Sequence, residues 1–133
     1  MYTVSFLFRR ILVPVDGSDS SFRALDVALD FAQRYGSRVT ALHVAGVGVD
    51  VDSLRRRVMD KAGEKGVAVE FKVRVFSPQT SSVSNEIINE IIEGGYDLVI
   101  LGARGSTANE ELLIGSTALS VVVNGAVSVL IIR

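Results

Sequence analysis

The sequence contains no cysteine, no tryptophan, two prolines and a single histidine. The absence of cysteine excludes a disulfide framework, a thiolate zinc site and a cysteine nucleophile, and it is consistent with a reducing cytoplasm. With one histidine, His43, a Ser-His-Asp system is not expected unless that residue is exposed. Because His43 lies inside the apolar run ALHVA, we predict a packed, hydrogen-bonded core side chain.

The chain also lacks an excess of charge of either sign. Its formal net charge is −1, so it has no global basic field, and neither nucleic acid nor an anionic membrane is an expected partner. With 133 residues, of which 48% are hydrophobic, the composition is typical of one globular domain spanning residues 1–133.

One uncharged run, residues 112–132, is long enough to span a bilayer. It is interrupted by Gly115-Ser116-Thr117 and by Asn124-Gly125, and the second interruption separates a helix-like piece from a β-branched piece. We therefore predict a helix and a strand here, in a soluble cytoplasmic protein.

Apolar periodicity predicts five strands and four helices in strict alternation. Such an order predicts an α/β fold, a parallel sheet with helices on both faces. For five strands the common orders are 3-2-1-4-5 and 2-1-3-4-5. The predicted strands are 9–15, 38–44, 67–76, 96–101 and 127–133, and the predicted helices are 20–35, 52–65, 83–93 and 115–124.

Two predicted strands have features of sheet edges. In strand 67–76 the charged residues Glu70, Lys72 and Arg74 share one face, which suits an edge strand with one solvated side. Strand 127–133 is apolar on both faces, and an exposed apolar edge favours pairing with another chain. We therefore predict a homodimer whose two chains pair through residues 127–132.

In open α/β sheets, ligands bind beyond the carboxyl ends of the strands, where the winding direction reverses. In the 3-2-1-4-5 order that point lies between the first and fourth strands, which end at Asp16 and at the stretch GARGSTANEELLIGST. Glycines there allow close backbone approach, and the helix that starts near Gly115 offers unpaired N–H groups to an anion. Ser116 and Thr117 add hydroxyls for phosphate oxygens or a metal.

Simpler interpretations stay open for both segments. The glycine stretch also suits a tight turn with Ser116 as a helix N-cap, and Asp16 suits a turn residue that binds its own backbone. The P-loop and the dinucleotide fingerprint G-x-G-x-x-G are both absent, which argues against a P-loop NTPase and a Rossmann dinucleotide site.

Three segments together resemble the universal stress protein family. They are ILVPVDGS at the end of the first strand, LHV at the end of the second, and the pattern G-2x-G-9x-G-[ST], here Gly102, Gly105 and Gly115-Ser116. The resemblance runs from residue 9 to residue 132. It implies a sheet ordered 3-2-1-4-5, a homodimer paired through the last strands and, as in many members, an ATP site.

The same resemblance implies roles for individual residues. The backbone at Val44 reads the adenine edge beside Pro14 and Val15, while Asp16 contacts the ribose near a metal. Ser116 is a second expected contact of Mg²⁺. The full expected nucleotide site comprises Pro14, Val15, Asp16, Val44, Gly102, Arg104, Gly105, Gly115, Ser116 and Thr117.

Two departures from the family pattern bear on function. Ala45 stands where many members have an acidic residue, and Glu110 and Glu111 place negative charge near the expected phosphates. The first hypothesis is an ATP-binding regulatory module of the stress response, with slow hydrolysis at most and no catalytic residue assigned. The alternative is a member that does not bind nucleotide and acts through dimerisation and protein contacts.

Overall fold

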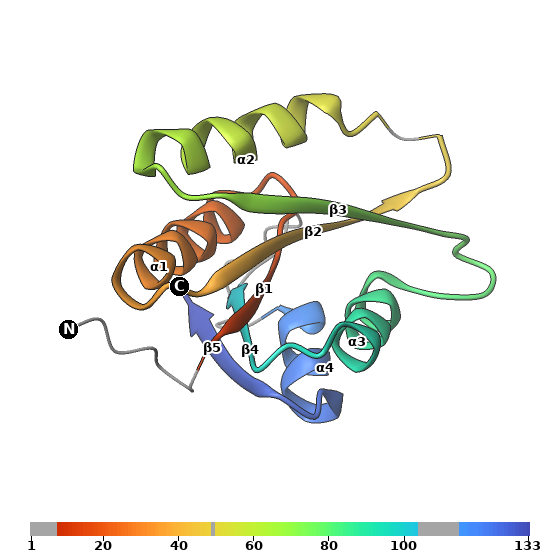
Figure 1. Cartoon of the computed structure of the whole chain (residues 1–133). Coiled ribbons are helices and arrows are strands. Elements are labelled where there is room, and N and C mark those ends of the chain that lie inside the picture. The colour runs from red at the N-terminus through yellow and green to blue at the C-terminus, as the bar shows by residue number, and fades with distance from the viewer. Residues whose placement is uncertain (1–7, 49, 104–114) are drawn as a thin grey trace.

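The computed structural model describes residues 8–48, 50–103 and 115–133, and all elements below belong to these ranges (Figure 1). Strands and helices alternate in the predicted order. They are β1 (Arg10–Pro14), α1 (Asp19–Tyr35), β2 (Arg38–Gly46), α2 (Asp52–Lys65), β3 (Val69–Phe76), α3 (Val83–Gly94), β4 (Leu98–Gly102), α4 (Ser116–Asn124) and β5 (Ser128–Ile132).

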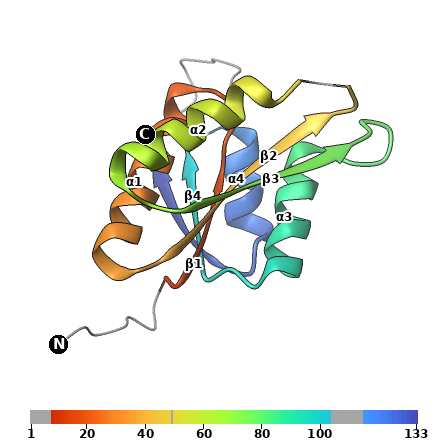
Figure 2. The same ribbon diagram turned by 45° about the horizontal axis from the view of Figure 1, so that its top comes forward.

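The five strands form one parallel sheet in the order β3-β2-β1-β4-β5. This confirms the 3-2-1-4-5 arrangement. The central strand β1 pairs with β2, where Arg10 is opposite Arg38, and with β4, where Ile11 is opposite Leu98. Figures 1 and 2 show the helices on both sides of the twisted sheet.

Each face of the sheet has its own hydrophobic core because alternate side chains of a strand point to opposite faces. From β1, Ile11 and Val13 pack into the core beneath α1 and α2, whereas Leu12 packs into the core beneath α3 and α4. All three are completely buried, and each contributes about 1.5–3 kcal/mol of hydrophobic stabilisation. This two-sided burial explains why three consecutive residues of the strand, Ile11 to Val13, are apolar.

The ends of α1 follow from local chemistry. At the N-terminus the Ser18 hydroxyl accepts a hydrogen bond from the Ser21 N–H at 3.2 Å. At the C-terminus Gly36 adopts φ 73°, a left-handed conformation that glycine enters without a steric penalty, and its N–H donates to the Ala32 carbonyl. Both end signals are local, which is why they are predictable from sequence.

The uncharged run divides as predicted. Helix α4 ends at Asn124 and β5 begins at Ser128. None of the described helices is both long enough and apolar enough to cross a membrane.

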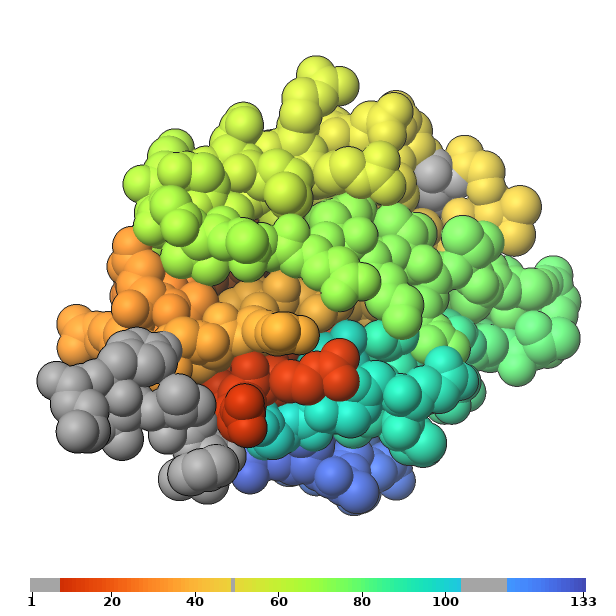
Figure 3. Space-filling view, viewed as in Figure 1, coloured from red at the N-terminus to blue at the C-terminus, as the bar shows by residue number. Residues whose placement is uncertain are grey.

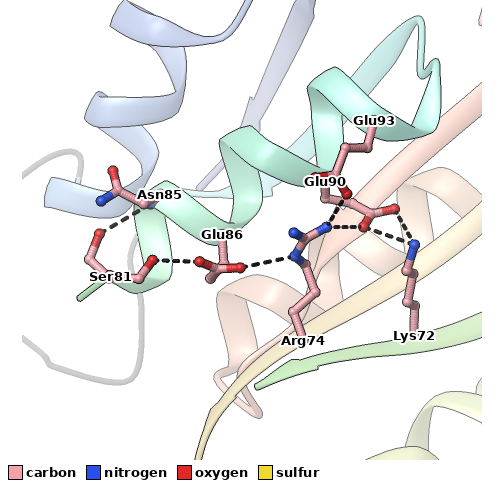
Figure 4. A network of polar contacts seen from close by, with 8 residues as sticks. Lys72, Arg74, Ser81, Asn85, Glu86, Glu90 and Glu93 are labelled. Atoms are coloured by element: carbon pink, nitrogen blue, oxygen red, sulfur yellow. Dashed lines mark hydrogen bonds and ion pairs between the residues drawn. The ribbon is translucent and has the colours of Figure 1, made fainter. Parts of the chain in front are cut away.

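The charged face of β3 differs from the prediction. β3 is an edge strand, but α3 packs over the part of this face that carries Lys72 and Arg74, whereas Glu70 is exposed (Figure 4). Glu90, which is 0% exposed, accepts hydrogen bonds from Lys72 at 2.9 Å and from Arg74 at 2.8 Å. Arg74 also bonds Glu86 at 3.1 Å. Lys72 and Arg74 therefore pair with a helix, an arrangement that alternation along the strand alone does not reveal.

The spacing of Ile87, Ile88, Ile91 and Ile92 in the sequence predicts one buried stripe along α3, and the observed stripe is narrower. Ile87 and Ile91 are buried, but Ile92 is 72% exposed, and the acidic Glu90 is buried instead. The prediction of a buried Ile92 is wrong because the helix is rotated to bring its glutamates onto Lys72 and Arg74.

Two of the three consecutive arginines of α2, Arg55 and Arg57, lie over aromatic rings. Arg55 lies over the ring of Phe71 at 5.2 Å, and Arg57 lies over the ring of Phe22 at 4.2 Å. Both distances fall within the range of cation–π attraction. The guanidinium groups of Arg55 and Arg57 therefore cover aromatic rings, although both residues are exposed.

Candidate functional site

The carboxyl ends of β2, β1 and β4 lie side by side at the point where the sheet's winding reverses. The β1–β2 register pairs Pro14 with Leu42, and continuing it by two residues brings Asp16 alongside Val44. The β1–β4 register pairs Leu12 with Val99, and β4, which is parallel to β1, ends at Gly102. Three separate sequence segments thus meet at one edge, as the strand order requires.

Both the N–H and the carbonyl of Val15 form hydrogen bonds with residues of β2. Its N–H donates to the Leu42 carbonyl at 2.8 Å, and its carbonyl lies 2.8 Å from His43 Nδ1. Because a carbonyl only accepts, the Nδ1 atom carries the hydrogen in this bond. The histidine is hydrogen-bonded as predicted, although it is half-buried rather than fully buried.

Asp16 is exposed at this edge and forms a turn. Its Oδ1 accepts a hydrogen bond from the Ser18 N–H at 3.0 Å, and its own N–H donates to the Ser21 hydroxyl at 3.4 Å. These contacts confirm the turn interpretation of the residue. They also hold its carboxylate beside the start of α1, where a ligand at the switch point would meet it.

Gly102 has a structural role that the sequence did not reveal. A Cβ atom at this position would lie 2.7 Å from the carbonyl carbon of Ser20, closer than real Cβ contacts. The end of β4 therefore packs directly against the first turn of α1. No local signal announces such a contact, because the two residues are far apart in the sequence.

Gly115 lies at the same edge of the sheet. Its N–H donates to the Ala103 carbonyl at 2.5 Å, and the Ala103 N–H in turn donates to the Ile132 carbonyl at 2.7 Å. Ala103 directly follows β4, the sheet neighbour of β1, and Asp16 lies two residues beyond the end of β1. The start of α4 is therefore tied to the strand end that neighbours Asp16.

The first turn of α4 presents polar groups. Gly115 is the N-cap residue and has no side chain with which to bind the helix N–H groups, unlike Ser18 and Ser82, which cap α1 and α3. Ser116 is exposed and Thr117 is half-buried. Backbone N–H groups and hydroxyls at a helix N-terminus are suited to binding an anion.

Not every predicted site residue is described. Arg104 and Gly105 lie outside the described residues, as do Glu110 and Glu111. Those that the structure places at the common edge are Pro14, Val15, Asp16, Val44, Gly102, Gly115, Ser116 and Thr117.

Metal ligands are sparse in the described part of the chain. Residues 8–48, 50–103 and 115–133 contain no group of three acidic or histidine side chains close enough to hold an ion. Asp16 and Ser116 supply two oxygen groups at the edge. This is too few for a protein-only site, but it suits Mg²⁺, which usually keeps waters and takes phosphate oxygens from a nucleotide.

Fold and site together define a doubly wound α/β domain with polar backbone groups gathered at its switch point. The chain belongs to the universal stress protein family, whose family model matches residues 7–133. This confirms the resemblance carried by the three sequence segments.

Individual relatives agree with the assignment along nearly the whole chain. Universal stress protein YxiE of Bacillus subtilis is 29% identical, and the match covers 96% of this chain and 100% of the relative. Among solved structures, the universal stress protein UspA from Lactobacillus plantarum has a TM-score of 0.80 and 25% identity, covering 97% of this chain and 100% of that one.

A second solved structure was determined with a ligand. It is a universal stress protein in complex with cAMP, with a TM-score of 0.76 and 25% identity. The match covers 96% of this chain and 98% of that chain. That relative binds a cyclic adenine nucleotide.

Proposed function

We propose that this chain binds ATP at the carboxyl edge of β2, β1 and β4, and that it acts as a dimeric, nucleotide-dependent regulatory module of the stress response. One observation carries the proposal: Asp16, Val44 and Gly115, from three distant segments, converge on one switch point. The cAMP complex of a relative with 25% identity supports an adenine nucleotide as the class of ligand.

Each part of the edge suits one part of the nucleotide. We assign the adenine to the backbone at Val44, beside Pro14 and Val15, and the ribose to Asp16. The phosphates face the first turn of α4, where the helix dipole, the N–H groups and the hydroxyls of Ser116 and Thr117 favour negative charge. Arg104, Gly102 and Gly105 complete the proposed phosphate side.

Mg²⁺ would accompany the triphosphate. When bound, it neutralises phosphate charge and takes oxygen ligands, which Asp16 and Ser116 are chemically able to provide. The role of this chain's own residues is to bind and orient the nucleotide rather than to catalyse rapid hydrolysis.

The dimer is proposed on the properties of β5. This strand forms one edge of the sheet and pairs with β4 on its inner side. Its side chains from Val129 to Ile132 are only half-buried, although they are all apolar. An edge strand of this kind is stabilised by pairing with a second copy, which covers backbone and apolar surface together.

Calorimetry of ATP with Mg²⁺ tests the phosphate position through Gly115→Val. Gly115 has φ −75° and ψ 163°, extended values that valine also adopts, so this variant adds bulk at the start of α4 in a backbone conformation open to valine. We expect the wild type to bind and Gly115→Val to show no measurable binding at millimolar ATP. Gly63→Val is the matched control, because a Cβ at exposed Gly63 meets nothing within 4 Å.

The outcomes separate the two hypotheses. A wild-type protein that fails to bind ATP, cAMP or AMP would refute nucleotide binding and leave dimerisation with protein contacts as the function. Equal binding by wild type and Gly115→Val would refute the phosphate position alone.

A further inference from the structure

The peptide group that joins Val15 to Asp16 lies just past the end of β1, where the regular pairing of β1 with β2 stops. β1 ends at Pro14, and the Val15 N–H still donates to the Leu42 carbonyl of β2 at 2.8 Å. Alternate residues of a parallel strand direct their backbone groups to the same neighbour, so Val44 faces β1 as Leu42 does. In a continued ladder, the Val44 N–H would therefore donate to the Val15 carbonyl.

The side chain of His43 takes the place of that backbone bond. Its Nδ1–H donates to the Val15 carbonyl at 2.8 Å. Within the described ranges, no backbone hydrogen bond outside the regular strands joins Val44 to Val15 or to Gly17. Gly17 has φ 87°, and the chain turns there into α1. The N–H and the carbonyl of Val44 therefore point towards the β1 side without a backbone partner from that segment.

The same peptide group is held at its other end from α1. A trans peptide directs its carbonyl and its N–H in opposite directions, and the Asp16 N–H donates to the Ser21 hydroxyl at 3.4 Å. The Ser21 hydroxyl in turn donates to the Ser18 carbonyl at 2.9 Å, and Ser21 is only 5% exposed. His43 and Ser21 thus orient this peptide from two different elements before any ligand binds.

The end of β2 is accessible from solvent. Val44 is half-buried, and Val47, the residue directly after β2, is 78% exposed. Figure 3 shows the yellow segment around the end of β2 at the outer surface of the molecule. A planar base that reaches this edge can therefore contact the backbone of Val44.

We infer that His43 is a positioning residue that sets the base specificity of the proposed nucleotide edge, a role that rests on the proposed function. By occupying the Val15 carbonyl, the His43 ring leaves the backbone donor and the backbone acceptor of Val44 open. The Watson–Crick edge of adenine offers the matching groups, an acceptor at N1 and a donor at N6. Hypoxanthine has a donor at N1 and an acceptor at O6, so in the same orientation it brings donor to donor.

Calorimetry with ATP and with inosine triphosphate, each with Mg²⁺, tests this specificity, because the two nucleotides share their ribose and phosphates. We expect the wild type to bind ATP about tenfold more tightly than inosine triphosphate. His43→Phe keeps a ring but loses the donor, so its affinity for ATP should fall to that for inosine triphosphate.

His43→Asn is the matched control for the hydrogen bond. Its amide nitrogen is attached to Cγ, as Nδ1 is in histidine, so this variant keeps a donor for the Val15 carbonyl although it loses the ring. We expect His43→Asn to keep the preference for ATP. A role of His43 in packing alone would reverse the order, with the preference retained by His43→Phe and lost in His43→Asn.

Amide hydrogen exchange tests the open Val44 N–H in the absence of nucleotide. In His43→Phe the Val15 carbonyl becomes available to Val44, so exchange of this N–H should be at least about tenfold slower than in the wild type. ATP should slow exchange of the same N–H in the wild type. His43 is the only histidine of the chain, so its ring nitrogens give a single set of NMR signals, which should show the Nδ1–H tautomer.

Two kinds of failure can be told apart. A wild type that binds neither nucleotide refutes the proposed function, and the role of His43 with it. If the wild type binds ATP but binds inosine triphosphate equally well, or if His43→Phe keeps the preference, the role of His43 alone is refuted. Exchange of the Val44 N–H that is as slow in the free wild type as in His43→Phe has the same consequence. Circular dichroism and urea denaturation check that each variant is folded before affinities are compared.

Discussion

Gly102 occupies a position where the backbone of α1 leaves no room for a side chain. The conflict is with the Ser20 carbonyl carbon, a backbone atom that moves only if the whole helix shifts. A glycine in a nucleotide-binding pattern is usually explained by the ligand, yet here the packing of β4 against α1 is a sufficient reason for it.

We expect Gly102→Ala to lower the free energy of unfolding by about 1–3 kcal/mol, the usual cost of overpacking. Urea denaturation followed by circular dichroism measures this. Gly63→Ala is the matched control: Gly63 lies within α2 with open space around it, so alanine should raise the free energy of unfolding by about 0.5–1 kcal/mol. An unchanged free energy of unfolding for Gly102→Ala would show that α1 shifts readily to make room for the added methyl group.

Asp16 accepts a hydrogen bond within a turn and also carries an exposed negative charge. The substitution Asp16→Asn removes the charge but keeps the acceptor. Asp16→Asn keeps an Oδ1 acceptor for the Ser18 N–H, whose hydrogen bond is 3.0 Å long. We expect the fold to be unchanged and the affinity for ATP with Mg²⁺ to fall by about tenfold, since a charged partner is lost. Calorimetry gives the affinity, and unchanged affinity would remove Asp16 from the proposed site.

At the scale of elements, the attachment of α3 to the edge strand β3 depends on one buried carboxylate. Burial alone would raise the pKa of Glu90, but hydrogen bonds from Lys72, Arg74 and Tyr96 outweigh burial and lower it. Conversely, burial together with the neighbouring Glu90 carboxylate raises the pKa of Tyr96 to about 12. The charges of strand and helix thus stabilise each other's ionised forms (Figure 4).

Removing this carboxylate leaves two cations next to a buried space. We expect Glu90→Ala to lower the free energy of unfolding by about 3–5 kcal/mol, the cost of breaking a buried ion pair from one side. Glu93→Gln is the control: Glu93 also bonds Arg74 but its side chain is 63% exposed, so its loss should cost less than about 1 kcal/mol. Similar costs for the two variants would contradict the central position of Glu90.

The lowered pKa of Glu90 also predicts a pH dependence. As pH falls, the unfolded chain binds a proton at this residue before the folded chain does, so acid favours unfolding. The stabilisation is complete above the unfolded pKa of about 4.3 and is lost as pH falls through the lower folded value. Urea midpoints measured from neutral to acidic pH should therefore fall more steeply for wild type than for Glu90→Gln. Parallel curves of urea midpoint against pH for the two proteins would contradict the lowered pKa of Glu90.

For the whole molecule, the main prediction concerns the number of chains. If β5 pairs with a second copy, sedimentation equilibrium at micromolar concentration should give about twice the chain mass of 14.3 kDa. The thermal midpoint should then rise with protein concentration, because association stabilises only the folded chain. A mass of one chain at millimolar concentration would refute the dimer and with it that part of the proposed function.

The order of the elements and many of their ends follow from the sequence alone. Apolar period and end signals such as Ser18 and Gly36 act within a few residues, so they can be read locally. The glycine pattern likewise indicated the family. For these reasons the switch-point edge, with Asp16 and Gly115 on it, could be predicted from local patterns and the strand order that they imply.

The contacts between distant segments, by contrast, are set by the tertiary structure. It brings Gly102 against Ser20, pairs the His43 ring with the Val15 carbonyl, and turns Glu90 rather than Ile92 into the interior. The physical reason is that the rotation of a helix over a sheet depends on which partners it meets across the layer. Spacing along one segment specifies a face, whereas the groups on the opposing element decide which residues of that face are buried.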